Sequence, residues 1–338
     1  MRVLVTGNRG YIGTHLVEIL KAEGHTVTGV DLDLFEGCEF DSFVEPDTQL
    51  RQDFRTLTAQ QVEGHDCVMH LAAISNDPMG DLDPNITYSI NRDGSIGLAT
   101  LAKSAGVPRF LLASSCSIYG KGEKLDLTEQ DALNPVSAYA ESKVDAEKGI
   151  GALADKNFTA GFLRNSTAYG YSPMLRIDLV VNNLLGCALS RGDIRIMSDG
   201  TPWRPLIHCR DIARAFVAFA KAPAEKIQNL PINVGGNAEN FQVRQVGDYV
   251  QRLVPKASIV YTGEVGNDPR NYRVSFDLLG RQLPEFSLAY TLESGMEELH
   301  RKMVEHGFSL EDFNGDRYVR LRTLKQRMDR LAATAVAD

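Results

Sequence analysis

Three glycines spaced three residues apart near the N-terminus constrain the fold more than any other feature of this sequence. Gly7, Gly10 and Gly13 lie in VLVTGNRGYIGTHL, between a short apolar run and an amphipathic segment. Glycine lets a strand turn tightly into a helix, and it lets backbone N–H groups approach an anionic group at the positive end of that helix. The spacing therefore predicts a strand, a turn and a helix whose N-terminus faces an anion.

Short apolar runs continue to alternate with amphipathic segments through the first half of the chain. We expect buried strands at residues 3–6, 26–31, 67–71, 110–114 and 158–164. We expect the helices between them at residues 12–22, 96–105 and 138–153. Strands that alternate with helices predict an α/β protein with a Rossmann-type, doubly wound parallel sheet built from right-handed crossovers.

The residue that ends the second expected strand indicates which dinucleotide the glycine turn would bind. Asp31 lies in GVDL, and a carboxylate there can accept hydrogen bonds from both ribose hydroxyls of NAD. The same carboxylate would repel the 2′-phosphate of NADP, and we expect no arginine beside it to compensate. The expected cofactor is therefore NAD, while a glycine turn without a ligand stays the alternative for this segment.

The segment TGNRGYIG resembles the opening of the extended short-chain dehydrogenase/reductase family, the NAD-dependent nucleotide-sugar epimerases and dehydratases. The resemblance continues along nearly the whole chain, through the segments DF, HLAA, SSCSIYG, YAESK and TPWRPLIHCRD. It implies that the cofactor is contacted by Gly7, Arg9, Gly10, Tyr11, Ile12, Gly13, Asp31, Asp53, Phe54, Leu71, Ala72, Ala73, Asn91, Tyr139 and Lys143.

Tyr139 and Lys143 lie four residues apart, so their side chains share one face of a helix. A hydroxyl becomes a ketone only if its proton leaves as its hydride passes to the cofactor, and tyrosine with an ordinary pKa of about 10 is a poor base at neutral pH. A nearby ammonium favours the phenolate. The resemblance implies that Ser115 binds the reacting oxygen and that Lys143 also holds the nicotinamide ribose. An ordinary helix-surface pair, with Ser115 capping a strand end, is the alternative.

Cys116 and Ser117 bear on the chemical step that comes after the oxidation. By resemblance, the 4,6-dehydratases carry Asp-Glu at these two positions, whereas the Ser-x-Ser arrangement here is similar to the epimerases. We therefore expect a nucleotide-sugar epimerase, acting at carbon 4 through a transient keto-sugar. The alternatives are a dehydratase with Cys116 in the elimination, a reductase or decarboxylase of the same family, and a non-catalytic dinucleotide sensor.

An NDP-sugar presents a diphosphate, which the planar and permanently charged arginine side chain binds well. The resemblance implies that Arg204 holds the diphosphate. The other candidates for substrate contact are Ser75, Ser117, Thr167, Asn183, Leu184 and Arg270, of which Thr167 replaces the family's customary asparagine. Acidic residues in the loop 75–81 argue against a uronic-acid substrate, because like charges repel in a closed site.

After residue 170 the pattern becomes less regular, with helices expected at residues 178–190 and 211–222, a strand at 194–197 and further elements at 242–253, 258–261 and 292–305. Asp211 is the expected cap of its helix. We divide the chain into an NAD-binding Rossmann domain at 1–170, a mainly substrate-binding α/β lobe at 171–317 with some elements returning to the core, and a surface helix and tail at 318–338. Residues 332–338 are expected to be disordered.

Composition excludes several other classes of protein. A net charge of −8 argues against nucleic-acid and anionic-membrane partners, and no apolar run approaches the length of a membrane span. Five widely spaced cysteines without a CxxC pair indicate reduced thiols in a cytoplasmic protein, with neither disulfides nor a metal site. The resemblance also implies a homodimer, formed through residues 96–105 and 138–153.

Overall fold

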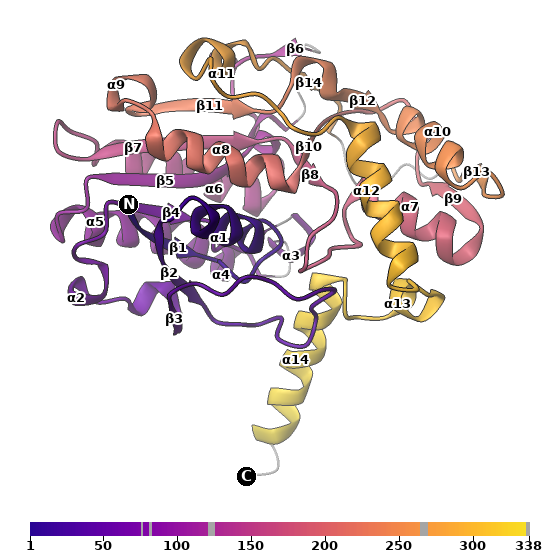
Figure 1. Cartoon of the computed structure of the whole chain (residues 1–338), viewed down its shortest axis with the longest axis horizontal. Helices are drawn as coiled ribbons and strands as arrows, with labels where there is room; N and C mark the ends of the chain where they lie inside the picture. The colour runs from indigo at the N-terminus through magenta and orange to yellow at the C-terminus, as the bar shows by residue number, and fades with distance from the viewer. Residues whose placement is uncertain (76, 81–82, 121–125, 264–269, 336–338) are drawn as a thin grey trace.

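A seven-stranded sheet forms the centre of the protein (Figure 1), in a computed structural model that describes residues 1–75, 77–80, 83–120, 126–263 and 270–335. The strand order is β11-β7-β5-β4-β1-β2-β3, and every neighbouring pair is parallel. The strands are β1 (Arg2–Thr6), β2 (Thr26–Asp31), β3 (Thr48–Arg51), β4 (Cys67–His70), β5 (Arg109–Ser115), β7 (Thr159–Asn165) and β11 (Leu230–Val234). The chain leaves β1 in both directions, which confirms the predicted Rossmann-type fold.

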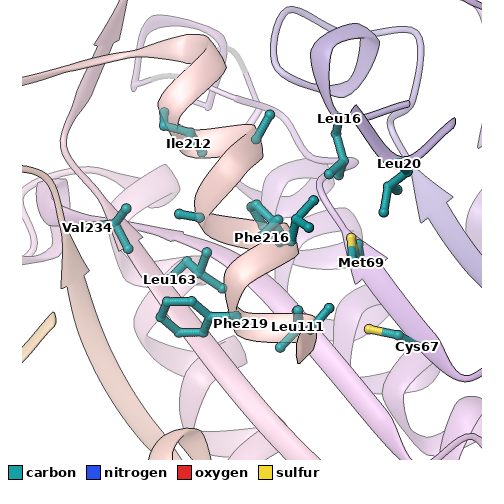
Figure 2. Close-up of a cluster of buried hydrophobic side chains, with 14 of the residues drawn as sticks. Leu16, Leu20, Cys67, Met69, Leu111, Leu163, Ile212, Phe216, Phe219 and Val234 are labelled. Carbon is teal, nitrogen blue, oxygen red and sulfur yellow. The ribbon is translucent and has the colours of Figure 1, made fainter. Parts of the chain in front are cut away.

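Helices cover both faces of this sheet because successive side chains of each strand point to opposite sides. Val3 and Val5 pack against one layer and Leu4 against the other. The first layer contains α1 (Gly13–Ala22) and α8 (Cys209–Lys221), joined at its edge by α9 (Ala224–Ile227) and α11 (Asp277–Gln282). Figure 2 shows Leu16 and Leu20 of α1 beside Phe216 of α8 above the strands. The second layer contains α2 (Ala59–Val62), α5 (Ser95–Ser104) and α6 (Ala138–Gly151).

The sequence patterns predicted neither of the two edge strands of the sheet. β3 has the sequence TQLR and is half exposed, so it lacks the apolar pattern of a buried strand. β11 comes late in the chain and contains Pro231, a residue that the outer strand of a sheet tolerates. Its pairing with β7 returns the chain to the sheet after it has already built much of the second lobe.

The second lobe extends beyond the carboxyl ends of the sheet strands (Figure 1). Its helices are α7 (Val180–Arg191), α10 (Val243–Leu253), α12 (Leu292–Glu305) and α13 (Leu310–Asn314). Its strands are β8 (Thr167–Tyr169), β10 (Trp203–His208) and β12 (Asn240–Gln242) in one sheet, β9 (Asp193–Ile196) with β13 (Ser258–Tyr261), and β6 (Asp126–Leu127) with β14 (Arg273–Val274). Leu185, Val250, Met296 and Leu299 belong to a separate hydrophobic core here.

Short elements connect β4 to α5 and pack against α6. They are α3 (Asp77–Gly80), α4 (Pro84–Thr87) and a π-helical segment, η2 (Tyr88–Gly94), that runs directly into α5. Three 3₁₀ turns are η1 (Phe54–Thr56), η3 (Cys116–Tyr119) and η4 (Asn237–Glu239). The loop 75–81 is described only in part, because Asn76 and Asp81 lie outside the described residues.

The structure corrects two local predictions. His208, not Asp211, caps α8, and the buried Asp211 carboxylate instead accepts hydrogen bonds from the backbone of Ala289 and Tyr290. The expected disorder at residues 332–338 is wrong for 332–335, which belong to α14 (Arg320–Ala335), the helix that projects from the body in Figure 1. Residues 336–338 lie outside the described residues.

Candidate active site

The glycine turn requires glycine at two of its three positions for steric reasons. Gly7 has a φ of +71°, and a Cβ there would lie 2.7 Å from the backbone nitrogen of Ala72. A Cβ on Gly13 would lie 2.1 Å from the carbonyl oxygen of Gly7. The turn from β1 into α1 therefore lies directly against the segment after β4. Because its glycines carry no side chains, a dinucleotide pyrophosphate can approach the backbone of the turn closely.

Asp31 ends β2 beside this turn. Its carboxylate accepts hydrogen bonds from the backbone N–H groups of Arg9 at 3.1 Å and Asp33 at 2.9 Å. Burial raises the pKa of this carboxyl above its usual value, and the two backbone bonds oppose that effect. The expectation that no arginine would lie beside Asp31 is wrong, since the Arg9 and Arg51 guanidiniums both reach Asp33.

Other residues of the turn connect the two lobes. The hydroxyl of Tyr11 donates to the carbonyl of Gly170 at 2.6 Å and accepts from Asn182 at 3.1 Å. Ile12 packs against the core under α1. The side chains of Tyr11 and Ile12 therefore hold the turn in place, and only their backbone remains for the cofactor contacts predicted for them.

The segment after β4 is fixed by one buried amide. Asn91 accepts a hydrogen bond from the N–H of Ile74 at 2.8 Å and donates to the Ile74 carbonyl at 3.0 Å and to Ser142 at 3.2 Å. Leu71 and Ala72 are half buried, and their backbone N–H groups donate to the carbonyl and the hydroxyl of Thr6 in β1. Asn91 thus ties Ala73 and its neighbours to α6, which is a positioning contact.

Asp53 and Phe54 lie in the turn after β3, which is an edge strand of the sheet. The Asp53 carboxylate binds the guanidinium of Arg55, which lowers the pKa of the carboxyl. Phe54 is buried and meets His70 edge-on, with 4.7 Å between ring centroids. The ring of Phe54 therefore belongs to the core, and its contact with the cofactor stays a prediction.

The three predicted catalytic side chains meet at the carboxyl end of β5. Ser115 is the last residue of β5, and its hydroxyl hydrogen-bonds to Tyr139 and lowers the pKa of the phenol. Burial has the larger effect and raises that pKa to about 12. The ammonium of Lys143 lies 5.9 Å from the centroid of the Tyr139 ring. Ser137 caps the helix that carries both residues.

Lys143 is held in a buried position by its helix. Its side chain is 2% exposed, and burial lowers the pKa of the ammonium to about 8, while Glu147 one turn later raises it. Glu147 is itself paired with Arg164 of β7 at 2.7 Å and accepts a hydrogen bond from Ser114. This buried pair places a negative charge behind the lysine.

Cys116 is buried in the core. Its thiol contacts the carbonyl of Arg164 at 3.2 Å and packs in a cluster with Ile118, Tyr119 and Val144. Burial raises the pKa of this thiol well above its usual value. Ser117 is also buried, and its hydroxyl has no hydrogen-bond partner among the described residues. An orphaned buried hydroxyl two residues from Ser115 is a group that a substrate can satisfy.

Five of the seven predicted substrate residues separate into two groups. Arg204 of β10 donates to the carbonyl of Arg270 at 2.6 Å, and the Arg270 guanidinium pairs with Asp77 at 3.0 Å and lowers the pKa of Tyr139. These contacts bring the two arginines together near the catalytic helix. The second group serves the lobe: Leu184 is buried in its core, Asn183 donates to the carbonyl of Ile177 at 3.1 Å, and Thr167 pairs with β10.

Sequence reasoning missed Arg176. This buried arginine pairs with Asp178 at 2.8 Å, donates to the hydroxyl of Ser75 at 3.3 Å and lowers the pKa of Tyr139. It adds a second permanent positive charge, besides Arg270, that acts on Tyr139. The one signal in the sequence was a pair of opposite charges, Arg-x-Asp, enclosed by apolar residues.

Comparisons with known proteins agree with this geometry. Residues 3–235 match the NAD dependent epimerase/dehydratase family. A UDP-glucose 4-epimerase of Lactobacillus helveticus is 30% identical over 259 residues, covering 70% of this chain and 76% of the relative. The solved structure of the NDP-hexosamine 5,6-dehydratase TunA superposes with a TM-score of 0.80 at 27% identity, covering 90% of this chain and 98% of the other. MoeE5 in complex with UDP-glucuronic acid and NAD gives a TM-score of 0.78 at 26% identity, covering 90% and 99%.

Within the family, relatives of this chain include UDP-sugar 4-epimerases and UDP-glucuronic acid decarboxylases. These relatives therefore differ in the reaction that their names state. The family match covers the whole Rossmann sheet from β1 to β11, including the glycine turn, Ser115, Tyr139 and Lys143. The chain belongs to the NAD-dependent epimerase/dehydratase family of the extended short-chain dehydrogenases/reductases, and it is an NAD-dependent nucleotide-sugar enzyme.

Proposed function

We propose that this protein is a nucleotide-sugar epimerase that acts at carbon 4 through a transient keto-sugar. The observation that carries the proposal is the pairing of a complete Ser115, Tyr139 and Lys143 set with a Cys116 that faces the core. Oxidation of a hydroxyl needs the first three residues. Elimination of water would need a further acid and base beside them, and the direction of Cys116 disfavours that role.

Bound NAD supplies the acceptor that takes up the hydride and later returns it to the sugar. Tyr139 takes the proton of the substrate hydroxyl, and Ser115 holds the oxygen of that hydroxyl by a hydrogen bond. The phenol has a pKa of about 12 in the protein alone, so it must be brought towards neutrality before it can act as a base. The Arg176 and Arg270 guanidiniums already lower this pKa against the effect of burial. We expect the Lys143 ammonium beside the ring to favour the phenolate further.

The substrate class follows from the positive charges around the catalytic tyrosine. We expect Arg204 to bind the diphosphate of an NDP-sugar through charge-assisted hydrogen bonds. Arg176 lowers the pKa of Tyr139 and donates to Ser75, so we expect the sugar ring to lie beside these residues. Because Arg270 already neutralises Asp77, the objection to a uronic acid is weaker than the sequence suggested. Neutral and uronic-acid sugars are therefore both to be tested.

Product analysis distinguishes the epimerase from its alternatives. The protein is incubated with UDP-glucose, UDP-glucuronic acid and UDP-N-acetylglucosamine, and the products are examined by mass spectrometry and proton NMR. An epimer of unchanged mass, formed without net consumption of NAD, supports the proposal. A product lighter by water or by carbon dioxide, or one that consumes a reducing equivalent, would assign the chain to the dehydratases, decarboxylases or reductases.

Three further expectations belong to this proposal. We propose a homodimer formed through the helices at 96–105 and 138–153; α5 and α6 pack closely, since a Cβ on Gly149 would lie 2.3 Å from Ile96. Light scattering during gel filtration tests the homodimer.

We also propose a cytoplasmic location and a functional division near residue 170. All five cysteines are free and buried, which suits a reducing compartment, and among the described residues no helix is long and apolar enough to cross a membrane.

A further inference from the structure

Two arginines from distant parts of the sequence meet one buried carboxylate beside Asp31. Arg9 Nη1 and Arg51 Nη2 each lie 3.4 Å from Oδ2 of Asp33. The Asp33 side chain is 5% exposed, whereas that of Arg51 is 55% exposed. Asp33 therefore acts as the buried centre of a small charge cluster at the carboxyl end of β2.

The guanidiniums of this cluster have further acidic partners. Arg9 binds both oxygens of Glu45 at 2.7 and 2.8 Å and lies over the ring of Phe43, 5.4 Å from its centroid. Arg51 contacts Glu36 at 3.3 Å. With Asp31 included, four carboxylates surround two guanidiniums here. The cluster is negative although it contains two arginines.

The cluster is coupled to the residue that reads the cofactor ribose. The Asp31 carboxylate accepts the backbone N–H groups of both Arg9 and Asp33, so these residues cannot move independently of it. A cavity of about 380 Å³ opens beside Arg9 and is lined on its other side by Glu39, Asp41 and Glu45. An arginine near this position is the usual means by which a Rossmann site accepts the 2′-phosphate of NADP.

We propose that Asp33 is a specificity-determining residue that enforces the choice of NAD by masking Arg9 and Arg51. Asp31 repels a 2′-phosphate directly, whereas Asp33 neutralises the two guanidiniums that would otherwise attract it. Two carboxylates with different actions thus discriminate against NADP. Replacing Asp31 alone should narrow the preference for NAD, because the direct repulsion is lost while the arginines remain neutralised. Removing the charge of Asp33 should leave Arg51 with only the exposed Glu36 as a partner among the described residues and should add a separate gain in affinity for NADP.

The informative variant is Asp33→Asn. Asp33 has a φ of +56°, and asparagine is one of the few residues with a side chain that adopts this left-handed conformation readily. The substitution keeps size and shape and removes only the charge. Glu305→Gln is the matched control, because it also removes one carboxylate but lies on α12, where Glu305 contacts Arg301.

Dissociation constants for NAD and NADP are measured by isothermal titration calorimetry. Asp33→Asn should bind NADP about tenfold more tightly than the wild type, with NAD affinity changed less than about threefold. The variant that combines Asp31→Ala with Asp33→Asn should bind NADP more tightly than Asp31→Ala alone. Arg9 stays paired with both oxygens of Glu45 in Asp33→Asn, so the gain should come from Arg51. Adding Arg51→Met to Asp33→Asn should therefore abolish most of the gain, and Glu305→Gln should change neither constant.

Unchanged NADP affinity in a folded Asp33→Asn variant would overturn the proposal, and so would a gain that survives Arg51→Met. Thermal denaturation and the NAD affinity report whether the variant is folded. If Asp33→Asn does not fold, Arg51→Met in the wild-type chain supplies the test. Because Arg51 is already neutralised, its loss should change NADP affinity less than about twofold, and a tenfold loss would refute masking.

Discussion

Replacing Lys143 with methionine should stabilise the folded protein while it removes activity. The lysine is 2% exposed, and burial lowers the pKa of its ammonium from 10.5 to about 8. Methionine is flexible, unbranched and uncharged, so it can occupy the space of the lysine side chain without the cost of burying a charge. Glu147 keeps Arg164 and Ser114 as partners in this variant.

The sign and size of the effect follow from proton binding. In the unfolded chain the lysine keeps its ordinary pKa of about 10.4, so the unfolded state holds the proton more tightly than the folded state. Below about pH 8 both states are protonated, and the folded state bears the full cost of the buried charge. Between about pH 8 and 10.5 the folded state loses the proton first, and this contribution to stability improves. The gap between the two pKa values corresponds to about 3 kcal/mol at pH 7.

The assay is urea denaturation of the NAD-free protein at several pH values between 7 and 10. Lys143→Met should exceed the wild type by up to about 3 kcal/mol at pH 7, with an advantage that shrinks as the pH approaches 10. Lys148→Met is the control on the same helix, since the Lys148 side chain is 74% exposed. Its effect should stay within about 0.5 kcal/mol at every pH. A Lys143→Met variant that is no more stable at pH 7, or whose advantage is independent of pH, would refute the reasoning.

Four other substitutions test the remaining parts of the site. Tyr139→Phe removes the proton acceptor and should lower kcat by about 10²–10⁴-fold with NAD affinity retained, as titration of NAD would show. Cys116→Ala should leave kcat within about threefold, because the thiol faces the core; loss of product while reduced NAD accumulates would instead place Cys116 in an elimination. Arg204→Ala should weaken UDP binding about 10–100-fold by calorimetry and leave NAD content unchanged. Glu147→Gln leaves Arg164 buried without its charge partner and should cost about 3–5 kcal/mol in urea denaturation.

The sequence alone determined the features that depend on residues close together along the chain. The Gly7–Gly13 turn is a backbone requirement that glycine meets and other residues do not, so its spacing specifies the first strand, turn and helix. The alternation of buried strands and amphipathic helices specifies the class of sheet. Tyr139 and Lys143 share a helical face because they are four residues apart, and the structure places them so.

Tertiary structure decided everything that depends on residues distant along the chain. β11 joins the sheet because β7 offers it an edge, which nothing near residue 230 indicates. Whether Cys116 faced the substrate or the core depended on where the turn after β5 packs, and it packs against residues more than a hundred positions later. Arg176 and Arg270 both act on the pKa of Tyr139, and Arg9 and Arg51 meet at Asp33, because the fold brings these segments together. Charges act through space, so their effects on binding and on pKa depend on these distances and not on spacing in the sequence.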